Sequence, residues 1–141
     1  MRQVDPEAGQ ILSRMRNATA AVILEHTGGC EWVVEAHGCN REPLCDIARL
    51  QQVFSRIIAE AGLHPVAEPV WHKFPGEGGV TGLALLSESH LACHTFPEYR
   101  SVCLNLFCCK PRPEWDFESR LKEMLGASTV IVRRIDRPYG S

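Results

Sequence analysis

Apolar positions along this chain recur at two different periods, and each period predicts its own kind of element. Between Leu44 and Gly62 they recur at helical spacing, and the glycine supplies a stop. A second helix is predicted from about Glu114 to Leu125, where Gly126 follows. Asp5-Pro6-Glu7 predicts the start of a third, short amphipathic helix, because aspartate is a good N-cap and proline is tolerated at the first helical position.

Shorter apolar runs between turn residues predict β-strands. Ala20–Glu25 and Glu31–Ala36, separated by Thr27-Gly28-Gly29, are expected to form a hairpin. Val66–Phe74 is expected at a sheet edge, because Pro69 has no amide proton for a ladder hydrogen bond. Further strands are predicted at Val80–Leu86, Leu91–Thr95, Ser101–Cys108 and Thr129–Ile135.

The order of these elements predicts a single domain over residues 1–141. Helices separated by runs of strands are typical of an α+β protein, here a two-layer sandwich of one antiparallel sheet covered on one face by helices. The uncovered face would need a partner, so a homodimer is expected.

Composition narrows the class of protein. The 141 residues are 45% hydrophobic and 23% charged, as in soluble globular proteins. A net charge of −2 and the lack of a basic run argue against nucleic acid as a partner. Residues Met1 to Asn17 contain no uninterrupted hydrophobic stretch, so neither a signal peptide nor a membrane span is expected. Seven cysteines without a CxxC pair argue against a disulfide framework or a structural zinc site, and they favour a reducing cytoplasm.

One stretch, Leu86–Tyr99, places two serines, two histidines, a cysteine and two carboxylates between apolar runs. Burying ionisable groups without partners is costly, so such a cluster between strands indicates a site. The GxSxG signature of serine hydrolases is absent around Ser89. A metal site is not expected, since His90 and His94 would share a strand face from which Cys93 points away.

A different use of a serine fits this stretch. In a tight turn, a serine hydroxyl can attack the carbonyl of the preceding residue and convert the peptide bond into an ester, which a nearby base then eliminates. The products are a free carboxyl on the upstream fragment and a pyruvoyl group at the new N-terminus, a ketone made without any bound cofactor.

The residues of this stretch resemble a known family. The small prokaryotic type of S-adenosylmethionine decarboxylase has the pattern ESH, three residues, HTWPEY, and then a strand that ends in FTCG. This chain is similar to it in Glu88-Ser89-His90, in His94–Tyr99 and in Phe107-Cys108-Cys109. The likeness covers roughly Trp32 to Lys110 and implies a decarboxylase that acts on S-adenosylmethionine and serves spermidine and polyamine synthesis.

The resemblance also implies how the chain would mature. Cleavage after Glu88 would divide it into residues 1–88 and 89–141. Ser89 would become the pyruvoyl group, which would take up the substrate amine as a Schiff base and accept the electrons that decarboxylation releases.

Five further residues receive roles from the resemblance. His94 would be the base for the elimination, and the hydroxyl of Thr81, where the family has serine, would assist processing. Cys109 would be the acid that protonates the substrate carbon after carbon dioxide leaves. Phe74 would stack on the adenine, and Glu98 would bind the ribose hydroxyls.

The chain departs from the family pattern around the pocket. Phe96 stands for Trp, Arg100 for Gly, Asn105 for Asp and Lys110 for Gly. One alternative is therefore a pyruvoyl-dependent decarboxylase of a basic amino acid, ornithine or arginine, with carboxylates around the side-chain cation. The candidate carboxylates are Glu31, Glu35 and Glu77. Another alternative is a binding or regulatory homologue that does not cleave itself.

Overall fold

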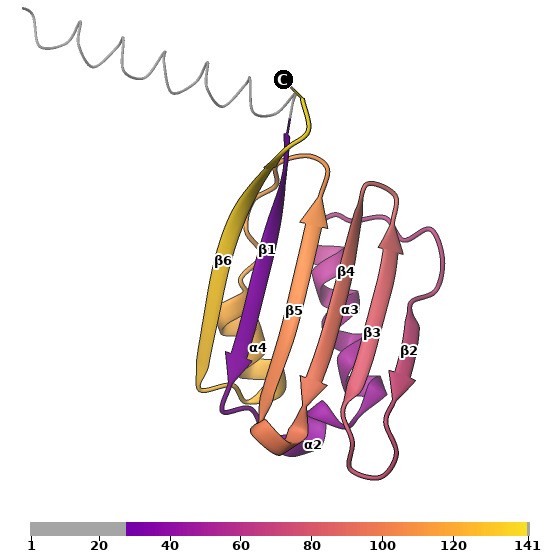
Figure 1. Ribbon diagram of the computed structural model, residues 1–141, viewed down its shortest axis with the longest axis vertical. Coiled ribbons are helices and arrows are strands. Elements are labelled where there is room, and N and C mark those ends of the chain that lie inside the picture. The colour runs from indigo at the N-terminus through magenta and orange to yellow at the C-terminus, as the bar shows by residue number, and fades with distance from the viewer. Residues whose placement is uncertain (1–27, 141) are drawn as a thin grey trace, which may run out of the picture.

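The computed structural model describes residues 28–140 of the chain (Figure 1). The helix predicted after Asp5 and the strand predicted at Ala20–Glu25 lie outside these residues. The elements in chain order are β1 (Gly28–His37), α2 (Arg41–Leu44), α3 (Ile47–Glu60), β2 (Val70–Lys73), β3 (Val80–Leu86), β4 (Ser89–Phe96), the 3-10 turn η1 (Pro97–Tyr99), β5 (Ser101–Cys108), α4 (Phe117–Leu125) and β6 (Thr129–Pro138).

The six strands form one sheet in the order β2-β3-β4-β5-β1-β6, and every neighbouring pair is antiparallel. The predicted antiparallel sheet is thus confirmed. Strands β2 to β5 follow one another along the chain and across the sheet, whereas β1 lies between β5 and β6. Strand β2, which follows Pro69, lies at one edge of the sheet, as the proline predicts.

The hairpin predicted for Glu31–Ala36 with Ala20–Glu25 is wrong. Both hydrogen-bonding edges of β1 are occupied, one by β5 and the other by β6. Gly29, which the sequence places in a turn, lies inside β1, where a Cβ would come within 2.2 Å of the carbonyl oxygen of Cys108. This glycine therefore permits the close approach of two chain segments instead of reversing the chain.

Two aspartates decide where the long helices begin. The side chain of Asp46 accepts a hydrogen bond from the Ala48 N–H at 3.0 Å, so α3 starts at Ile47. The helix predicted from Leu44 therefore begins three residues later, and Leu44 is instead the last residue of α2. Asp116 caps α4 in the same way, since its side chain accepts a hydrogen bond from the Ser119 N–H at 3.2 Å. Helix α4 therefore begins at Phe117, three residues after the predicted start at Glu114.

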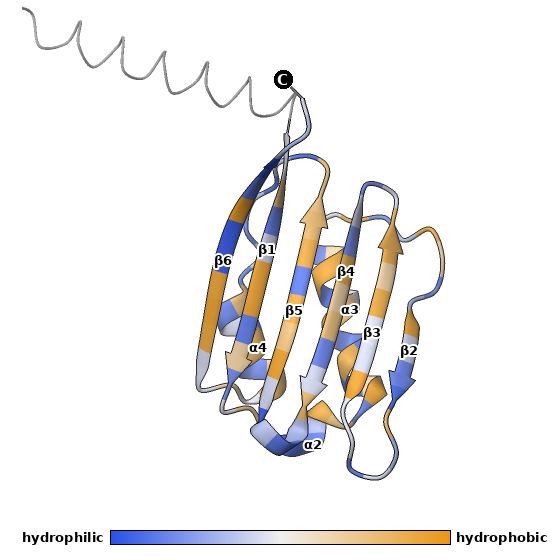
Figure 2. Ribbon diagram, in the orientation of Figure 1, coloured by the Kyte–Doolittle hydropathy of each residue, from blue (hydrophilic) through white to orange (hydrophobic). Residues whose placement is uncertain are grey.

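Alternate strand residues and the inner faces of the helices form the core. In Figure 1 the helices lie behind the sheet, and Figure 2 shows hydrophobic residues interrupted by polar ones along β1 and β6. Trp32 of β1 is 1% exposed and lies 6.5 Å from the ring of Phe117 in α4, while Phe54 of α3 lies 4.6 Å from the ring of Trp71 in β2. No helix in the described part of the chain is long and apolar enough to cross a membrane.

The opposite face of the sheet carries many exposed apolar side chains, and we call it the open face. Its residues have the other strand parity from the core residues. Leu83 is 51% exposed and Leu85 is 60% exposed. The exposed apolar residues of this parity are Val70, Leu83, Leu85, Phe96, Ile131 and Ile135. Apolar surface of this extent is typical of a face that contacts another molecule.

Candidate functional site

The predicted cleavage site lies in the tight turn between β3 and β4. Leu86 pairs with Ser89, so Ser87 and Glu88 alone connect the two strands. Ser89 is the first residue of β4 and lies opposite Cys108 of β5. The main-chain carbonyl of Glu88 accepts a hydrogen bond from the N–H of Cys109, the residue after Cys108, at 2.8 Å. The carbonyl that Ser89 would attack therefore already has a hydrogen-bond donor in place.

The turn after β5 supplies this donor. The carbonyl oxygen of Cys109 accepts a hydrogen bond from the Tyr139 hydroxyl at 3.0 Å. The side chain of Lys110 lies 4.0 Å from the carboxylate of Glu88. Residues of or next to three other strands thus contact the end of β5 and this turn. Tyr139 directly follows β6, Glu88 directly precedes β4, and Gly29 of β1 packs against Cys108.

His94 and Thr81 form a second cluster, on the open face. The Thr81 hydroxyl and the His94 Nδ1 lie 3.1 Å apart and share a hydrogen bond. The two residues are cross-strand partners on β3 and β4, and Cys103 lies opposite His94 on β5. A hydroxyl on one ring nitrogen of a histidine fixes the orientation of the ring and leaves the other nitrogen available for proton transfer.

The structure does not bring His94 and Ser89 together within one chain. They are five residues apart in β4, which corresponds to about 17 Å along an antiparallel strand. An odd separation also places their side chains on opposite faces of the sheet. One protomer therefore cannot use its own His94 as a base at its own Ser89.

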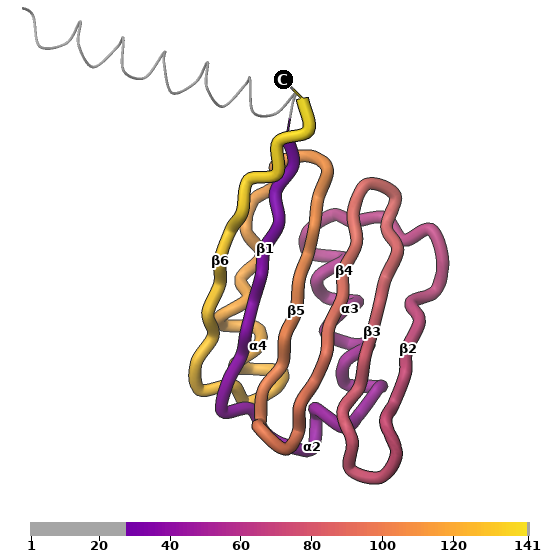
Figure 3. Tube along the Cα trace, in the orientation of Figure 1, coloured from indigo at the N-terminus to yellow at the C-terminus, as the bar shows by residue number. Residues whose placement is uncertain are grey.

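The two residues predicted to bind substrate lie nearer to His94 than to Ser89. Phe74 is in the loop between β2 and β3, 50% exposed, with its ring edge-on to His72 at 4.7 Å. Glu98 is exposed in η1, directly after β4. Figure 3 shows that this loop and η1 lie at one end of the sheet, while the β3–β4 turn lies at the other.

The predicted residues therefore fall into two groups, which we name the cleavage end and the histidine end. The cleavage end contains Glu88, Ser89 and Cys109, and the histidine end contains Phe74, Thr81, His94 and Glu98. The sequence shows the residue types of each group, but not that a whole strand length separates them.

Burial distinguishes the thiols near the cleavage end. Cys108 faces the core, where desolvation, followed by the nearby Cys30 thiol, raises its pKa to about 11. Cys93 is also buried, and desolvation raises its pKa to about 12. Cys109 has the opposite strand parity and is only partly buried. Of these three cysteines, Cys109 alone can present its side chain outside the core.

The carboxylates considered for a basic amino acid already have arginine partners. Glu31 forms an ion pair with Arg137 of β6, and it also accepts a hydrogen bond from the Asn105 amide at 3.3 Å. Glu35 is paired with Arg133 of β6. Glu77 forms an ion pair with Arg41 at 2.8 Å. Each carboxylate of this set is thus paired with an arginine of the same chain, so the geometry gives no support to the ornithine or arginine alternative.

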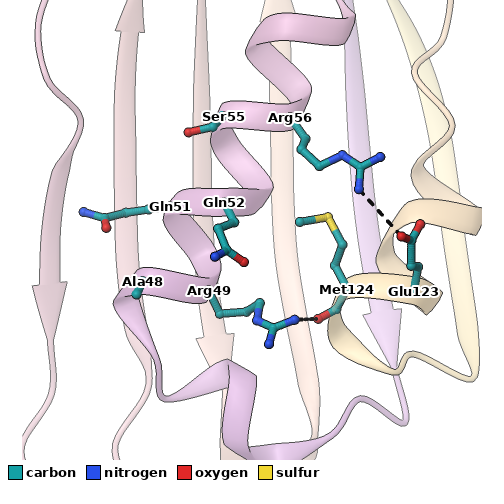
Figure 4. Close-up of a pocket in the computed structure, with 8 residues that line it drawn as sticks. All are labelled: Ala48, Arg49, Gln51, Gln52, Ser55, Arg56, Glu123 and Met124. Atoms are coloured by element: carbon teal, nitrogen blue, oxygen red, sulfur yellow. Dashed lines mark hydrogen bonds and ion pairs between the residues drawn. The ribbon is translucent and has the colours of Figure 1, made fainter.

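A groove on the helical side is separate from both groups. It lies between α3 and α4 and has a volume of about 630 Å³ (Figure 4). Two arginines border it. The Arg49 guanidinium donates to the Met124 carbonyl at 3.5 Å, and the Arg56 guanidinium lies 3.7 Å from the Glu123 carboxylate. None of the predicted site residues lines it. Within residues 28–140, no group of three or more His, Cys, Asp or Glu side chains is arranged to hold a metal ion.

Comparison with known proteins identifies the family. A family model described as S-adenosylmethionine decarboxylase matches residues 30–138. The S-adenosylmethionine decarboxylase proenzymes of Moorella thermoacetica and Syntrophomonas wolfei are 36% and 35% identical over 106 residues, which cover 74% of this chain and 83% and 82% of those proteins. The crystal structure of the adenosylmethionine decarboxylase from Aquifex aeolicus has a TM-score of 0.66 at 17% identity, covers 82% of this chain and 94% of that chain, and shows the same fold. Because the family model spans most of the chain and both relatives exceed 30% identity, this chain belongs to the S-adenosylmethionine decarboxylase family.

Proposed function

We propose that this chain is a self-processing, pyruvoyl-dependent decarboxylase of S-adenosylmethionine. Its product would serve as the aminopropyl donor for spermidine and other polyamines. The observation that carries the proposal is the hydrogen bond from the Cys109 N–H to the Glu88 carbonyl, directly before Ser89. The relatives named above are proenzymes by name, which supports maturation by cleavage. All seven cysteines are free, which supports a reducing, cytoplasmic location.

The first step of processing is an acyl shift from nitrogen to oxygen. The Ser89 Oγ attacks the Glu88 carbonyl carbon, and a negative charge develops on the carbonyl oxygen. The Cys109 N–H, 2.8 Å from that oxygen, stabilises the charge. The new C–O bond forms in this attack; the C–N bond then breaks, the nitrogen takes up the proton that the Ser89 hydroxyl gives up, and the peptide has become an ester.

The second step is an elimination that needs a base. A base removes the Cα proton of residue 89, and the electron pair forms a double bond to Cβ while the ester oxygen leaves with Glu88 as a carboxylate. Addition of one water to residue 89 of the downstream fragment, 89–141, and loss of one ammonia from it convert that residue into the pyruvoyl ketone. That ketone supplies the electron-accepting carbonyl for decarboxylation.

His94 is proposed as this base, with its orientation set by Thr81. If the His94 Nδ1–H donates to the Thr81 hydroxyl, the other ring nitrogen carries the free electron pair that a base requires. Because His94 and Ser89 of one chain are about 17 Å apart along β4, the histidine has to come from another chain, and it would act on the Cα proton of residue 89 and not on the Ser89 side chain.

A homodimer through the open faces would bring the two groups together. Two copies related by a two-fold axis that lies between the two sheets, parallel to them and perpendicular to the strands, would stack with their strands in opposite directions, so the cleavage end of one copy would face the histidine end of the other. The exposed apolar side chains of the open face support such packing, which would cover the sheet left bare by the helices. The predicted two-layer sandwich would then be half of a larger assembly.

The same dimer would assemble the site for turnover. The partly buried Cys109 thiol would act as the acid near the pyruvoyl group of its own chain. Phe74 and Glu98 of the partner would provide a ring face for the adenine and a carboxylate acceptor for the ribose hydroxyls. Each active site would therefore use residues of both copies.

Intact mass spectrometry of the denatured protein tests the self-processing. We expect two fragments, 1–88 and 89–141, the second carrying a ketone in place of its terminal amine, and a single uncut chain for Ser89→Ala. Ser87→Ala is the matched control, since Ser87 is the neighbouring serine of the same turn, and it should still be cut between residues 88 and 89. A wild-type chain that stays whole after long incubation would contradict the proposal and favour a binding or regulatory role.

A further inference from the structure

Glu88 is held at two points by two consecutive residues of the turn after β5. Its main-chain carbonyl accepts the Cys109 N–H at 2.8 Å. Its side-chain carboxylate lies 4.0 Å from the Nζ of Lys110. One short turn thus contacts both the carbonyl that would be attacked and the side chain of the residue that carries it.

The backbone of this turn is held by hydrogen bonds from β1 and from the residue directly after β6. The Tyr139 hydroxyl donates to the Cys109 carbonyl at 3.0 Å, and the Cys30 thiol donates to the Lys110 carbonyl at 3.8 Å. These contacts fix the position of the backbone. The side chain of Lys110 is 65% exposed, so it can follow a change of charge at Glu88.

We propose that Lys110 is a positioning residue for self-cleavage, which acts through Glu88 by balancing the negative charge that this residue gains. The proposal rests on the proposed function, since it concerns the same cleavage. It assigns a task to a lysine at a position where the family pattern has glycine.

The charge of Glu88 rises during the reaction. Before cleavage its only negative group is the side-chain carboxylate, and in the tetrahedral adduct the carbonyl oxygen becomes negative as well. After cleavage Glu88 is a C-terminal residue with two carboxylates. An ammonium group beside Glu88, 4.0 Å from its side-chain carboxylate, lowers the energy of both later states relative to the first, because attraction grows with the negative charge of this residue.

Solvent limits the size of this effect. Both side chains are more than half exposed, so the ion pair is screened by water and salt. We therefore expect loss of the charge to slow cleavage by about two- to fivefold and not to abolish it. Since exposed ion pairs weaken with salt, the rate of the wild-type chain should also fall with ionic strength.

The test follows cleavage of newly made full-length chains. The wild type, Lys110→Met and Lys110→Arg are synthesised in a short cell-free pulse and then chased at low and at high ionic strength. The fraction of fragments 1–88 and 89–141 is measured over time by mass. Lys122→Met is the matched control, because it removes a lysine from another exposed ion pair, with Glu118 at 2.9 Å on α4.

We expect Lys110→Met to cleave two- to fivefold more slowly than the wild type at low ionic strength and to lose the salt dependence. Lys110→Arg should cleave at nearly the wild-type rate, and Lys122→Met should behave as the wild type does. Equal rates and equal salt dependence for wild type and Lys110→Met would overturn the proposal while leaving self-processing intact, and so would an equal slowing in Lys110→Arg. A wild-type chain that does not cleave would overturn the proposed function and this inference with it.

Discussion

At the scale of single residues, the backbone and the side chain of Cys109 have separate tasks. The N–H contacts the Glu88 carbonyl, and the thiol is the proposed acid of the turnover reaction. Every residue except proline carries an N–H, so substitution of the side chain leaves the first contact in place. The two tasks can therefore be separated by one mutation.

We predict that Cys109→Ala cleaves itself within about fivefold of the wild-type rate but decarboxylates at least about 100-fold more slowly, since general acid catalysis is typically worth that much. Mass spectrometry measures the cleavage, and release of labelled carbon dioxide measures the turnover. Cys45→Ala, which removes another partly buried thiol, should retain both activities. A Cys109→Ala chain that stays uncut would show that the thiol itself is needed for processing.

At the scale of elements, the periodic segments were predicted well and their pairing was not. The bounds predicted for β3 and β5 are those of the structure, because each is a mostly apolar run that ends at polar or turn residues. The partner of β1 was predicted wrongly, because Gly29, which looks like a turn residue, instead allows β1 to lie close to the end of β5. Long-range pairing depends on which surfaces fit together, and local turn chemistry does not report it.

Strand parity also predicts which side chains can meet. Parity places His94 and Cys93 on opposite faces, and the same rule separates His94 from Ser89. The strand predicted at Leu91–Thr95 left out Ser89, however, so the separation of the two residues follows only from the structure, in which β4 begins at Ser89. The residues that a partner would add to the proposed site were not predictable either, because they would depend on how two open faces stack.

The core side of these strands carries two thiols whose burial predicts a pH dependence. Desolvation raises the pKa of Cys93 from 9.0 to about 12 and that of Cys108 to about 11. The folded state therefore keeps these protons at a pH where the unfolded chain releases them. Their contribution to stability is complete below about pH 9 and is lost as the pH rises toward 11 and 12.

We predict that between pH 9 and 11 each of these thiols lowers the free energy of unfolding by about 1.4 kcal/mol per pH unit. Urea unfolding of wild type and Cys93→Ala across this range measures the slope, which should be smaller in the variant by that amount. Between pH 6 and 8, where neither state releases a thiol proton, the two stability curves should run parallel. Equal slopes above pH 9 would show that Cys93 is ionised to the same extent in both states.

At the scale of the whole molecule, the described chain keeps the residues of the proposed site apart, at the cleavage end and at the histidine end. Ser89 and Cys109 are at one end of the sheet, and Thr81 and His94 are on the open face toward the other end. A face-to-face dimer explains both this separation and the exposed apolar residues of the open face. Such a dimer would make the cleavage of each chain dependent on its partner.

This dependence predicts complementation between two inactive variants. Ser89→Ala keeps His94 but cannot cleave itself, and His94→Ala keeps Ser89 but lacks the base. When the two are co-expressed, a mixed dimer pairs the intact Ser89 of one chain with the intact His94 of the other. We expect cleavage only of the His94→Ala chain, in up to about half of its copies if dimers form at random. Mass spectrometry distinguishes the two chains by their fragments.

The controls decide where the histidine acts. Each variant expressed alone should remain essentially uncut. His64→Ala removes an exposed histidine that belongs to neither the cleavage end nor the histidine end, and this variant should be cut as the wild type is. Co-expression of Ser89→Ala with a chain that carries both substitutions should give no fragments, because Ser89 is then missing from every copy. If the mixed dimer stays whole although a size measurement shows that it forms, His94 does not act across the interface. Processing would then require a rearrangement that brings the two ends of one sheet together, which the length of β4 makes far more costly than association of two open faces.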